Sequence, residues 1–252
     1  MKYIILLITT FTLLLAQSPE EKGLQIATEM DKRDQGFKDT QVRITMTLKN
    51  QHGQTSVRYM RSKTLEGTTD GDKSMIIFDQ PADVKGTATL TYTHKQGSDD
   101  QWLYLPAIKR VKRISSNNKS GPFMGSEFAY EDLSSQEIEK YTYKYIKDED
   151  NHFVIERYPV DPKSGYTKHV VWVNKNEYRA EKIEFYDRKG ELLKTLNFSG
   201  YEKYLEKFWR AKEFKMENHQ TGKSTTLAFE DYAFKTGLKE NNFNKNSLKR
   251  AR

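Results

Sequence analysis

The sequence predicts a mainly β (α+β) protein, with a strongly curved antiparallel sheet, or incomplete barrel, of about eleven strands covered by a few helices. The first reason is alternation, because apolar residues such as Val42, Ile44 and Met46 are separated by polar ones, as in a strand with one buried face. The second is the series of short polar turns, such as residues 161–165 and 187–190. A long antiparallel series curls instead of lying flat.

Two helices are expected to cover this sheet. The first spans residues 18–35, where Ser18 caps the helix, Pro19 takes its first position and Glu21 completes a capping box. The second spans about residues 130–140 and presents apolar side chains on one side. The remaining apolar stretches have the period of strands, and residues 208–217 are expected to form a single strand.

The first residues have the pattern of a secretory signal peptide. Lys2 is the only charged residue before Glu20, and a short apolar stretch leads to the small residue Ala16. This stretch is shorter than the roughly 20 residues that a membrane helix needs. Because Leu14 stands where a small residue is usual, an uncleaved anchor is the alternative. We expect a signal peptide at residues 1–16 and an exported protein.

The composition limits the partners. The sequence contains no Cys, so we expect no disulfides and no lipid-acceptor cysteine after the signal. Its formal net charge of +7 comes from Lys and Arg that are interspersed with Asp and Glu, which is typical of a solvated surface. We therefore expect no nucleic-acid partner. No low-complexity linker divides the chain, so residues 17–252 are expected to form one domain.

No motif predicts catalysis. The five His residues are scattered without the spacing of a metal site. Ser126 lacks the second flanking glycine of a nucleophile elbow, because Glu127 follows it. The neighbouring carboxylates Glu131 and Asp132 are explained by the dipole at the start of the second expected helix. We expect no enzyme activity, no metal site and no cofactor.

The most informative part of the sequence is its middle. Residues 101–114 predict an aromatic hairpin with a basic return strand, and residues 121–133 predict an apolar loop interrupted by glycines. Loops usually run over the surface, so Phe123, Met124 and Phe128 need an explanation. They either plug one end of the concave sheet or form a hydrophobic lid over a pocket, with the glycines as hinges.

The same two runs carry a resemblance to a known family. WLYLPAIKRVKRI at 102–114, followed by GPFMGSEFAYEDL at 121–133, resembles the signature of the bacterial outer-membrane lipoprotein-sorting protein family. That family is similar to the lipoprotein carriers LolA and LolB, and the likeness extends over nearly the whole chain after the signal. It implies an incomplete barrel with helices as a lid, and between them an apolar space that holds acyl chains.

The resemblance also suggests which residues line the cavity and hold the lid. The expected lining residues are apolar and come from the early strands, the hairpin and the loop: Val42, Ile44, Met46, Leu48, Leu90, Tyr92, Trp102, Tyr104, Phe123, Met124 and Phe128. In the carrier family an arginine on an early strand helps to latch the lid, and Arg43, Arg58 and Arg61 are candidates by residue type.

A second set of latch candidates lies in the signature itself. Arg110 and Arg113 are expected to form salt bridges with Glu127, Glu131 or Asp132. Contact with an anionic headgroup, or simple solvation of a strand face, are the alternatives for these two arginines.

We therefore expect a soluble periplasmic carrier or chaperone that binds lipid or lipoprotein acyl chains for transfer towards the outer membrane. An inner-membrane transporter is a candidate partner, and no stable membrane span is expected after cleavage. Without a lipid anchor, such a carrier would be a free shuttle. The alternative is a non-catalytic accessory or scaffold protein of an envelope export machine, whose core would be filled. A hydrolase would need converging polar groups in the same cavity.

Overall fold

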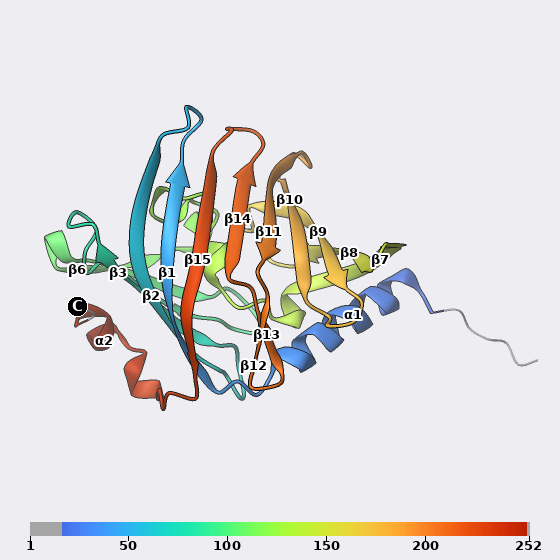
Figure 1. Ribbon diagram of the computed structural model, residues 1–252, viewed down its shortest axis with the longest axis horizontal. Helices are drawn as coiled ribbons and strands as arrows, with labels where there is room; N and C mark the ends of the chain where they lie inside the picture. The colour runs from blue at the N-terminus through green and yellow to red at the C-terminus, as the bar shows by residue number, and fades with distance from the viewer. Residues whose placement is uncertain (1–16, 251–252) are drawn as a thin grey trace, which may run out of the picture.

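One antiparallel sheet of thirteen strands curves around the core of the protein without closing (Figure 1). The structure is a computed structural model that describes residues 17–250, so the predicted signal peptide at residues 1–16 lies outside the described residues. In sheet order the strands are β6 (Arg110–Ile114), β5 (Asp100–Leu105), β4 (Ala88–Tyr92), β3 (Lys73–Gln80), β2 (Thr55–Leu65), β1 (Asp39–Lys49), β15 (Ser224–Phe234), β14 (Glu213–Asn218), β11 (Leu192–Ser199), β10 (Ala180–Asp187), β9 (Tyr166–Asn174), β8 (His152–Pro159) and β7 (Tyr141–Glu149).

The sheet consists of two halves that meet where the two ends of the chain pair. Strands β1 to β6 follow one another to one edge, and β7 to β11 and then β14 lead back from the other edge. Strand β15 lies between β14 and β1, with Met46 opposite Leu227 in the register. Among the described strands, β6 and β7 remain the two edges. This confirms the predicted fold class, a mainly β protein with a curved and unclosed antiparallel sheet.

The predicted number of strands, about eleven, is wrong, because the structure has fifteen. The other two strands, β12 (Glu202–Tyr204) and β13 (Phe208–Arg210), form a separate ribbon. This ribbon divides the expected single strand at residues 208–217, since the chain leaves it after β13 and enters the main sheet as β14. Its turn contains Leu205 and Glu206 with φ of 50° and 56°, left-handed conformations that hydrophobic alternation does not reveal.

The first helix, α1 (Pro19–Asp34), begins as the sequence predicts. The Oγ of Ser18 accepts a hydrogen bond from the backbone N–H of Glu21 at 3.1 Å, and the Glu21 carboxylate accepts one from the N–H of Ser18 at 2.9 Å. The helix packs on β7, where Gly23 brings the two backbones together. A Cβ on Gly23 would lie 2.8 Å from backbone atoms of Lys144, so a larger residue would push the helix away.

The second predicted helix, at about residues 130–140, is wrong. The segment contains two short 3₁₀ turns, Tyr130–Leu133 and Ile138–Lys140, with extended backbone at Ser134 and Glu137 between them. Ser135 explains the interruption, because its N–H donates to Thr93 Oγ1 at 3.2 Å and its hydroxyl donates to Asp72 at 2.9 Å. Contacts with the sheet therefore replace the local helical hydrogen bonds.

Hydrophobic side chains cover both faces of the sheet. The larger cluster fills the concave side and includes Met46, Phe78, Phe123, Val171 and Met216. A smaller cluster lies on the other face of β3, β4 and β5, beneath the C-terminal tail and its short helix α2 (Lys245–Lys249). Two apolar side chains of this tail, Phe243 and Leu248, are buried in the smaller cluster and hold the tail on the sheet.

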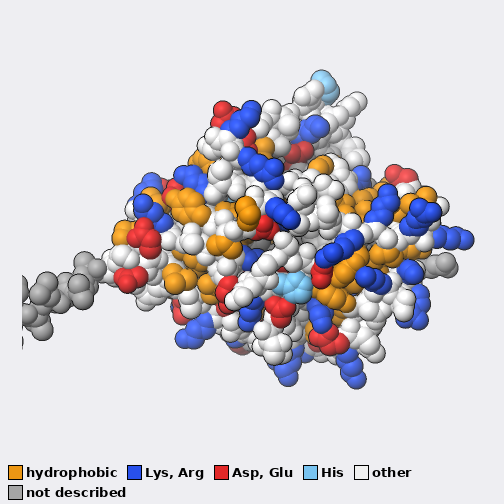
Figure 2. All heavy atoms as spheres, turned by 180° about the vertical axis from the view of Figure 1, so that it is seen from behind, with side chains coloured by type: hydrophobic (Ala, Val, Ile, Leu, Met, Phe, Trp, Pro, Cys, Tyr) orange, Lys and Arg blue, Asp and Glu red, His pale blue; other side chains and the backbone are white. Residues whose placement is uncertain are grey.

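The outer surface is mixed in charge. Figure 2 shows Lys and Arg side chains interspersed with Asp and Glu over the face opposite to that of Figure 1, with hydrophobic side chains gathered in smaller patches. This agrees with the expectation that the net charge belongs to a solvated surface. Among residues 17–250, no helix has both the length and the apolar character to cross a membrane.

Candidate functional site

A cavity of about 420 Å³ lies on the concave side of the sheet, beneath the segment of residues 119–141, which we call the covering segment. Ligand pockets usually measure about 300–1,000 Å³. The floor of the cavity consists of side chains from β8, β9, β10, β11 and β14, and the loop of residues 95–99 borders it. Its apolar lining side chains include Phe128, Tyr141, Tyr166, Ile183, Phe185, Leu196, Phe198 and Phe214.

The strand register arranges the floor residues, together with buried residues that lie beside them on the same strands, in rows that cross the sheet. The first row is largely polar and passes over five adjacent strands. Each residue in it lies opposite the next: Arg157, His169, Phe185, Lys194 and Asn218. This row gives one end of the floor a polar character, because Arg157 and Lys194 belong to it and both are buried.

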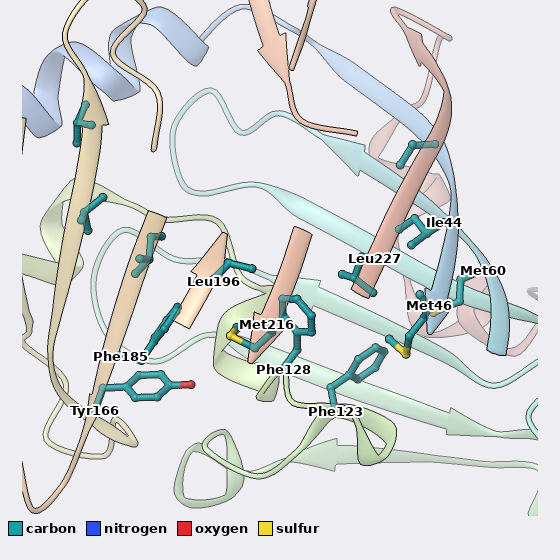
Figure 3. Close-up of a cluster of buried hydrophobic side chains, with 14 of the residues drawn as sticks. Ile44, Met46, Met60, Phe123, Phe128, Tyr166, Phe185, Leu196, Met216 and Leu227 are labelled. Atoms are coloured by element: carbon teal, nitrogen blue, oxygen red, sulfur yellow. The ribbon is translucent and has the colours of Figure 1, made fainter. Parts of the chain in front are cut away.

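The next two rows are apolar. The second contains Ile155, Val171, Ile183, Leu196 and Met216, which again lie opposite one another. In the third, Phe153 lies opposite Val173 and Phe198 opposite Phe214. Figure 3 shows Met216 of β14 beside Phe128 of the covering segment, with Phe185 and Tyr166 next to each other farther along the sheet. The floor is therefore amphipathic, polar at one end and apolar at the other.

The polar row contains a buried pair, Arg157 and His169. Arg157 Nε donates to His169 Nδ1 at 3.0 Å, and the two residues are 9% and 3% exposed. Burial lowers the pKa of His169 well below its usual value, and the charges of Arg157 and Lys194 act in the same direction. His169 is therefore neutral, and because Nδ1 accepts a hydrogen bond, its proton lies on Nε2.

The covering segment is attached to the first half of the sheet through Phe123. This side chain is 1% exposed, and its ring centroid lies 5.7 Å from those of Phe78 and Tyr130. On the next residue, the carbonyl oxygen of Met124 accepts a hydrogen bond from the guanidinium of Arg58 on β2. Gln101 on β5 donates to the carbonyl of Tyr130 at 2.8 Å.

The early-strand arginines thus have different roles. Arg58 contacts the covering segment, whereas Arg43 pairs with Asp231 and Arg61 pairs with Asp79 at 2.7 Å. The structure therefore distinguishes between three candidates that the sequence left open.

The second half of the sheet holds the covering segment through Asp132. Lys194 Nζ on β11 lies 2.6 Å from Asp132 Oδ2 and donates to the carbonyl of Glu127 at 2.9 Å. The other carboxylate oxygen of Asp132 accepts the hydroxyl of Tyr166 at 2.9 Å. Burial raises the pKa of Tyr166 well above its usual value, so this hydroxyl remains a donor.

The other two predicted latch acids also face this half. The Glu127 carboxylate accepts a hydrogen bond from Asn218 Nδ2 at 2.7 Å. Glu131 accepts from Ser164 Oγ at 2.9 Å and from the N–H of Gly165 at 2.8 Å. Burial raises the pKa of Glu131.

The structure corrects the prediction that Arg110 and Arg113 form salt bridges with these acids. Arg113 pairs instead with Asp100 on the neighbouring strand, and Arg110 is exposed on the edge strand β6. The physical reason for Arg113 is the face of the sheet on which it lies. It is opposite Trp102, whose side chain belongs to the smaller cluster on the other face, whereas Glu131 and Asp132 line the cavity. The buried cation at the latch is Lys194, which the sequence signature does not include.

The structure separates the predicted lining residues into two groups. Those on the concave side belong to the larger cluster: Val42, Ile44, Met46, Leu48, Phe123, Met124 and Phe128. Of these, Phe128 lines the cavity itself, and contact of the others with a ligand stays a prediction. The remaining four lie on the opposite face, beneath the C-terminal tail: Leu90, Tyr92, Trp102 and Tyr104.

The position of these four residues corrects the prediction that they line the cavity. The prediction failed because both faces of the sheet are covered in this region. On β4 the inward positions are taken by Thr89 and Thr91, which are 4% and 2% exposed, and Leu90 points outward. Inward threonines bond to polar groups, as Thr91 Oγ1 does with Gln101 Nε2 at 3.4 Å. When both faces of a strand are buried, apolar alternation does not reveal which face is the inner one.

Sequence reasoning missed most of the cavity floor. The alternation in Ile183 and Phe185, and in Leu196 and Phe198, was a usable signal for inward positions. The clearest signal was Arg157, a charged residue two positions after the apolar Ile155 on the same face. Among the described residues, no group of three or more His, Asp or Glu side chains is placed to hold a metal ion.

Comparisons with solved structures agree with this geometry. A structure named as an outer membrane lipoprotein-sorting protein domain, from Vibrio parahaemolyticus, is 61% identical, covers 92% of this chain and 100% of its own, and has a TM-score of 0.90. A DUF1329 family protein from Desulfovibrio piger is 29% identical, with 92% and 99% coverage and a TM-score of 0.86. A LolA superfamily protein from Nitrosomonas europaea, 22% identical with 89% and 99% coverage and a TM-score of 0.72, shares the fold.

A family model described as an uncharacterized protein matches residues 70–250. No curated protein gives a significant match.

The unclosed antiparallel sheet, with a segment laid across its concave side, gives the chain a fold of the LolA-like class. Within that class, the chain belongs to the outer-membrane lipoprotein-sorting protein family, as the resemblance in residues 102–133 predicted.

Proposed function

We propose that the protein is a periplasmic carrier that holds an acyl chain of a lipid or lipoprotein in its cavity and does not change it chemically. The observation that carries this proposal is the pair of apolar rows beneath the covering segment. Ile183, Leu196 and Phe214 would remove a hydrocarbon chain from water, at roughly 0.8 kcal/mol for each buried methylene. The names of the relatives, a lipoprotein-sorting domain and a LolA superfamily protein, support the same function.

A carrier must also release its cargo, and the attachment of the covering segment is suited to that. The segment is held by hydrogen bonds, by the Lys194–Asp132 ion pair and by the insertion of Phe123. All of these contacts are non-covalent, so they can be broken one after another along the segment. A membrane partner that displaces it would open the apolar rows to a lipid chain, and an inner-membrane transporter remains our expected partner for loading.

The first experiment is extraction of bound lipid. The protein is purified from a Gram-negative periplasm without detergent, and the organic extract is examined by mass spectrometry. Co-purified lipid or lipoprotein, together with displacement of a fluorescent fatty-acid probe, is the expected result. An empty extract combined with no probe binding would contradict the carrier proposal and favour a scaffold role in an envelope export machine.

A matched pair of variants shows whether the cavity is the binding site. Ile183→Phe fills space in the second row of the floor, and we expect it to weaken probe binding by at least tenfold. Ile146→Phe makes the same change at an exposed position of β7, where 42% of the residue is accessible, and should leave binding unchanged. Equal binding by both variants would place the ligand elsewhere. Phe123→Asp and Met124→Asp test in the same assay whether residues 121–133 act as the lid.

A further inference from the structure

We propose that Arg157 and His169 form an anion site at the polar end of the cavity, so that the cargo is an amphiphile whose headgroup is an oxyanion. A carboxylate and a phosphate share this chemistry. The inference rests on the proposed function, because the acyl chain of the same ligand would occupy the apolar rows.

The first step in the argument is the isolation of Arg157. Its guanidinium lies over the ring of Tyr141, 4.7 Å from the centroid, and its Nε donates to His169. Among the described residues, no carboxylate lies within ion-pair distance of it, although it is 9% exposed. An arginine is rarely buried without a partner of opposite charge, because loss of hydration disfavours the charged form. An anion in the cavity would supply that partner.

The second step is the orphaned donor on His169. Since Nδ1 accepts from Arg157, the neutral ring carries its proton on Nε2, and this atom is buried with no hydrogen-bond partner in the described part of the chain. An unsatisfied buried donor costs free energy, which a ligand oxygen would recover. Arg157 and His169 are directly opposite each other in the β8–β9 register and both line the cavity. Arg157 and His169 therefore each supply a donor at the polar end of the cavity.

The acidic residues that line the cavity do not act as the partner of Arg157. Asp161 pairs with Lys119 at 2.6 Å, Asp132 pairs with Lys194 at 2.6 Å, and Asp99 pairs with Lys140. Of the two other carboxylates on the lining, Glu131 accepts hydrogen bonds from Ser164 and Gly165, and Glu139 is exposed. The local carboxylates are thus engaged elsewhere or solvated.

The rows of the floor give the ligand a direction. Arg157 and His169 lie in the polar row, Ile183 and Leu196 follow in the second, and Phe198 and Phe214 in the third. A molecule with its charged group on the first row would lay its chain over the second and third. The arrangement has the polarity of a single-chain anionic amphiphile.

The test compares ligands that differ only in the headgroup. Binding of laurate, methyl laurate and dodecyl phosphate is measured below their aggregation limits by displacement of a neutral fluorescent alkyl probe. We expect at least one of the two anions to bind about tenfold or more tightly than the ester, as charge-assisted hydrogen bonds require. The tighter anion identifies the source of the oxyanion, and inorganic phosphate alone measures the site without a chain.

The matched variants assign the effect to the site. In Arg157→Gln, the affinity for the two anions should fall to that for methyl laurate, and the affinity for methyl laurate should change less than about twofold. Arg157→Lys should retain part of the difference in affinity between the anions and the ester. Arg43→Gln, an exposed β1 arginine paired with Asp231, is the control and should behave as the wild type. If the glutamine variant does not fold, the ¹⁵N shift of His169 Nε2 on addition of laurate to the wild type provides the same test.

The outcomes separate the two proposals. Equal affinity for laurate, dodecyl phosphate and methyl laurate in the wild type, an unchanged ratio in Arg157→Gln, or no response of His169 would overturn the anion site and leave the carrier function standing. Absence of binding by all three ligands would overturn both.

Discussion

Lys194 Nζ lies 2.6 Å from Asp132 Oδ2, and their side chains are only 4% and 7% exposed. Asp132 belongs to the covering segment and Lys194 to strand β11 of the sheet, so this ion pair ties the two together. Tyr166 and the backbone N–H of Ala129 also donate to the same carboxylate, at 2.9 and 2.7 Å. Because the pair is almost dry, removing either charge leaves the other one uncompensated.

Lys194→Met should therefore destabilise the protein strongly. A buried partner left without its opposite charge costs about 3–5 kcal/mol, which we expect as a fall in the free energy of unfolding in urea. The double variant Lys194→Met with Asp132→Leu removes both charges and should cost clearly less than the sum of the two single changes. Additive costs in this cycle would show that the pair is not coupled.

Arg58→Met should loosen the tip of the covering segment without unfolding the protein. The guanidinium of Arg58 donates to the carbonyl of Met124, and a hydrogen bond to a charged group contributes about 1.5–3 kcal/mol. Amides of residues 121–128, such as Ser126 N–H bonded to Phe123 O, should then exchange with deuterium roughly 10–100 times faster.

The control for this change is Arg43, an exposed arginine on the neighbouring strand β1. Arg43→Met removes an exposed pair with Asp231, which is worth about 0–1 kcal/mol, so exchange in the covering segment should stay as in the wild type. Unchanged exchange in Arg58→Met as well would mean that Phe123 alone holds the tip.

The sequence predicts those features whose signals are local. The capping box of Ser18 and Glu21 locates α1, and the alternation from Val42 to Leu48 locates β1 and its inner face. The 3₁₀ turns near Ser135 could not be predicted, because they depend on hydrogen bonds to Thr93 and Asp72, far away in the chain.

The candidate site was predicted only in part, for the same reason. Phe123 and Phe128 are conspicuous as apolar residues in a loop, and the structure places them inside. The partner of Asp132 is 62 residues away on β11, and no local pattern pairs them. Arg157 and Lys194 are visible in the sequence only as charges at inward positions, which become informative once the register is known.

Phe243→Ala should separate stability from ligand binding. Phe243 is 1% exposed and belongs, with Trp102, to the smaller hydrophobic cluster beneath the C-terminal tail. Its truncation should therefore cost about 3–5 kcal/mol of unfolding free energy. The cavity lies on the other face, so the affinity for the fatty-acid probe should stay within about twofold under native conditions. Phe128→Ala, which truncates a side chain on the cavity lining, is the matched change that should reduce both. A large loss of affinity for the probe in Phe243→Ala would mean that the smaller hydrophobic cluster takes part in binding.

Stability should also depend on pH through Glu137. Burial, with the nearby charge of Asp72, raises the pKa of Glu137 from 4.5 to about 7. The folded protein therefore holds this proton more tightly than the unfolded chain does. The stabilising contribution is complete below about pH 4.5 and is lost as the pH rises to about 7.

Between about pH 5 and pH 8, the free energy of unfolding should therefore fall by about 1 kcal/mol on account of this group, since its partial exposure screens the effect. Asp72, whose pKa is also raised by burial, adds a change of the same sign, so the measurement is the difference between wild type and Glu137→Gln in urea unfolding at the two pH values. As the pH rises, the free energy of unfolding of Glu137→Gln should increase relative to that of the wild type. Glu139→Gln, at an exposed neighbouring position, should not show this increase. A constant difference between wild type and Glu137→Gln would mean that Glu137 is ionised in the folded protein over this whole range, and that the end of the covering segment tolerates its charge.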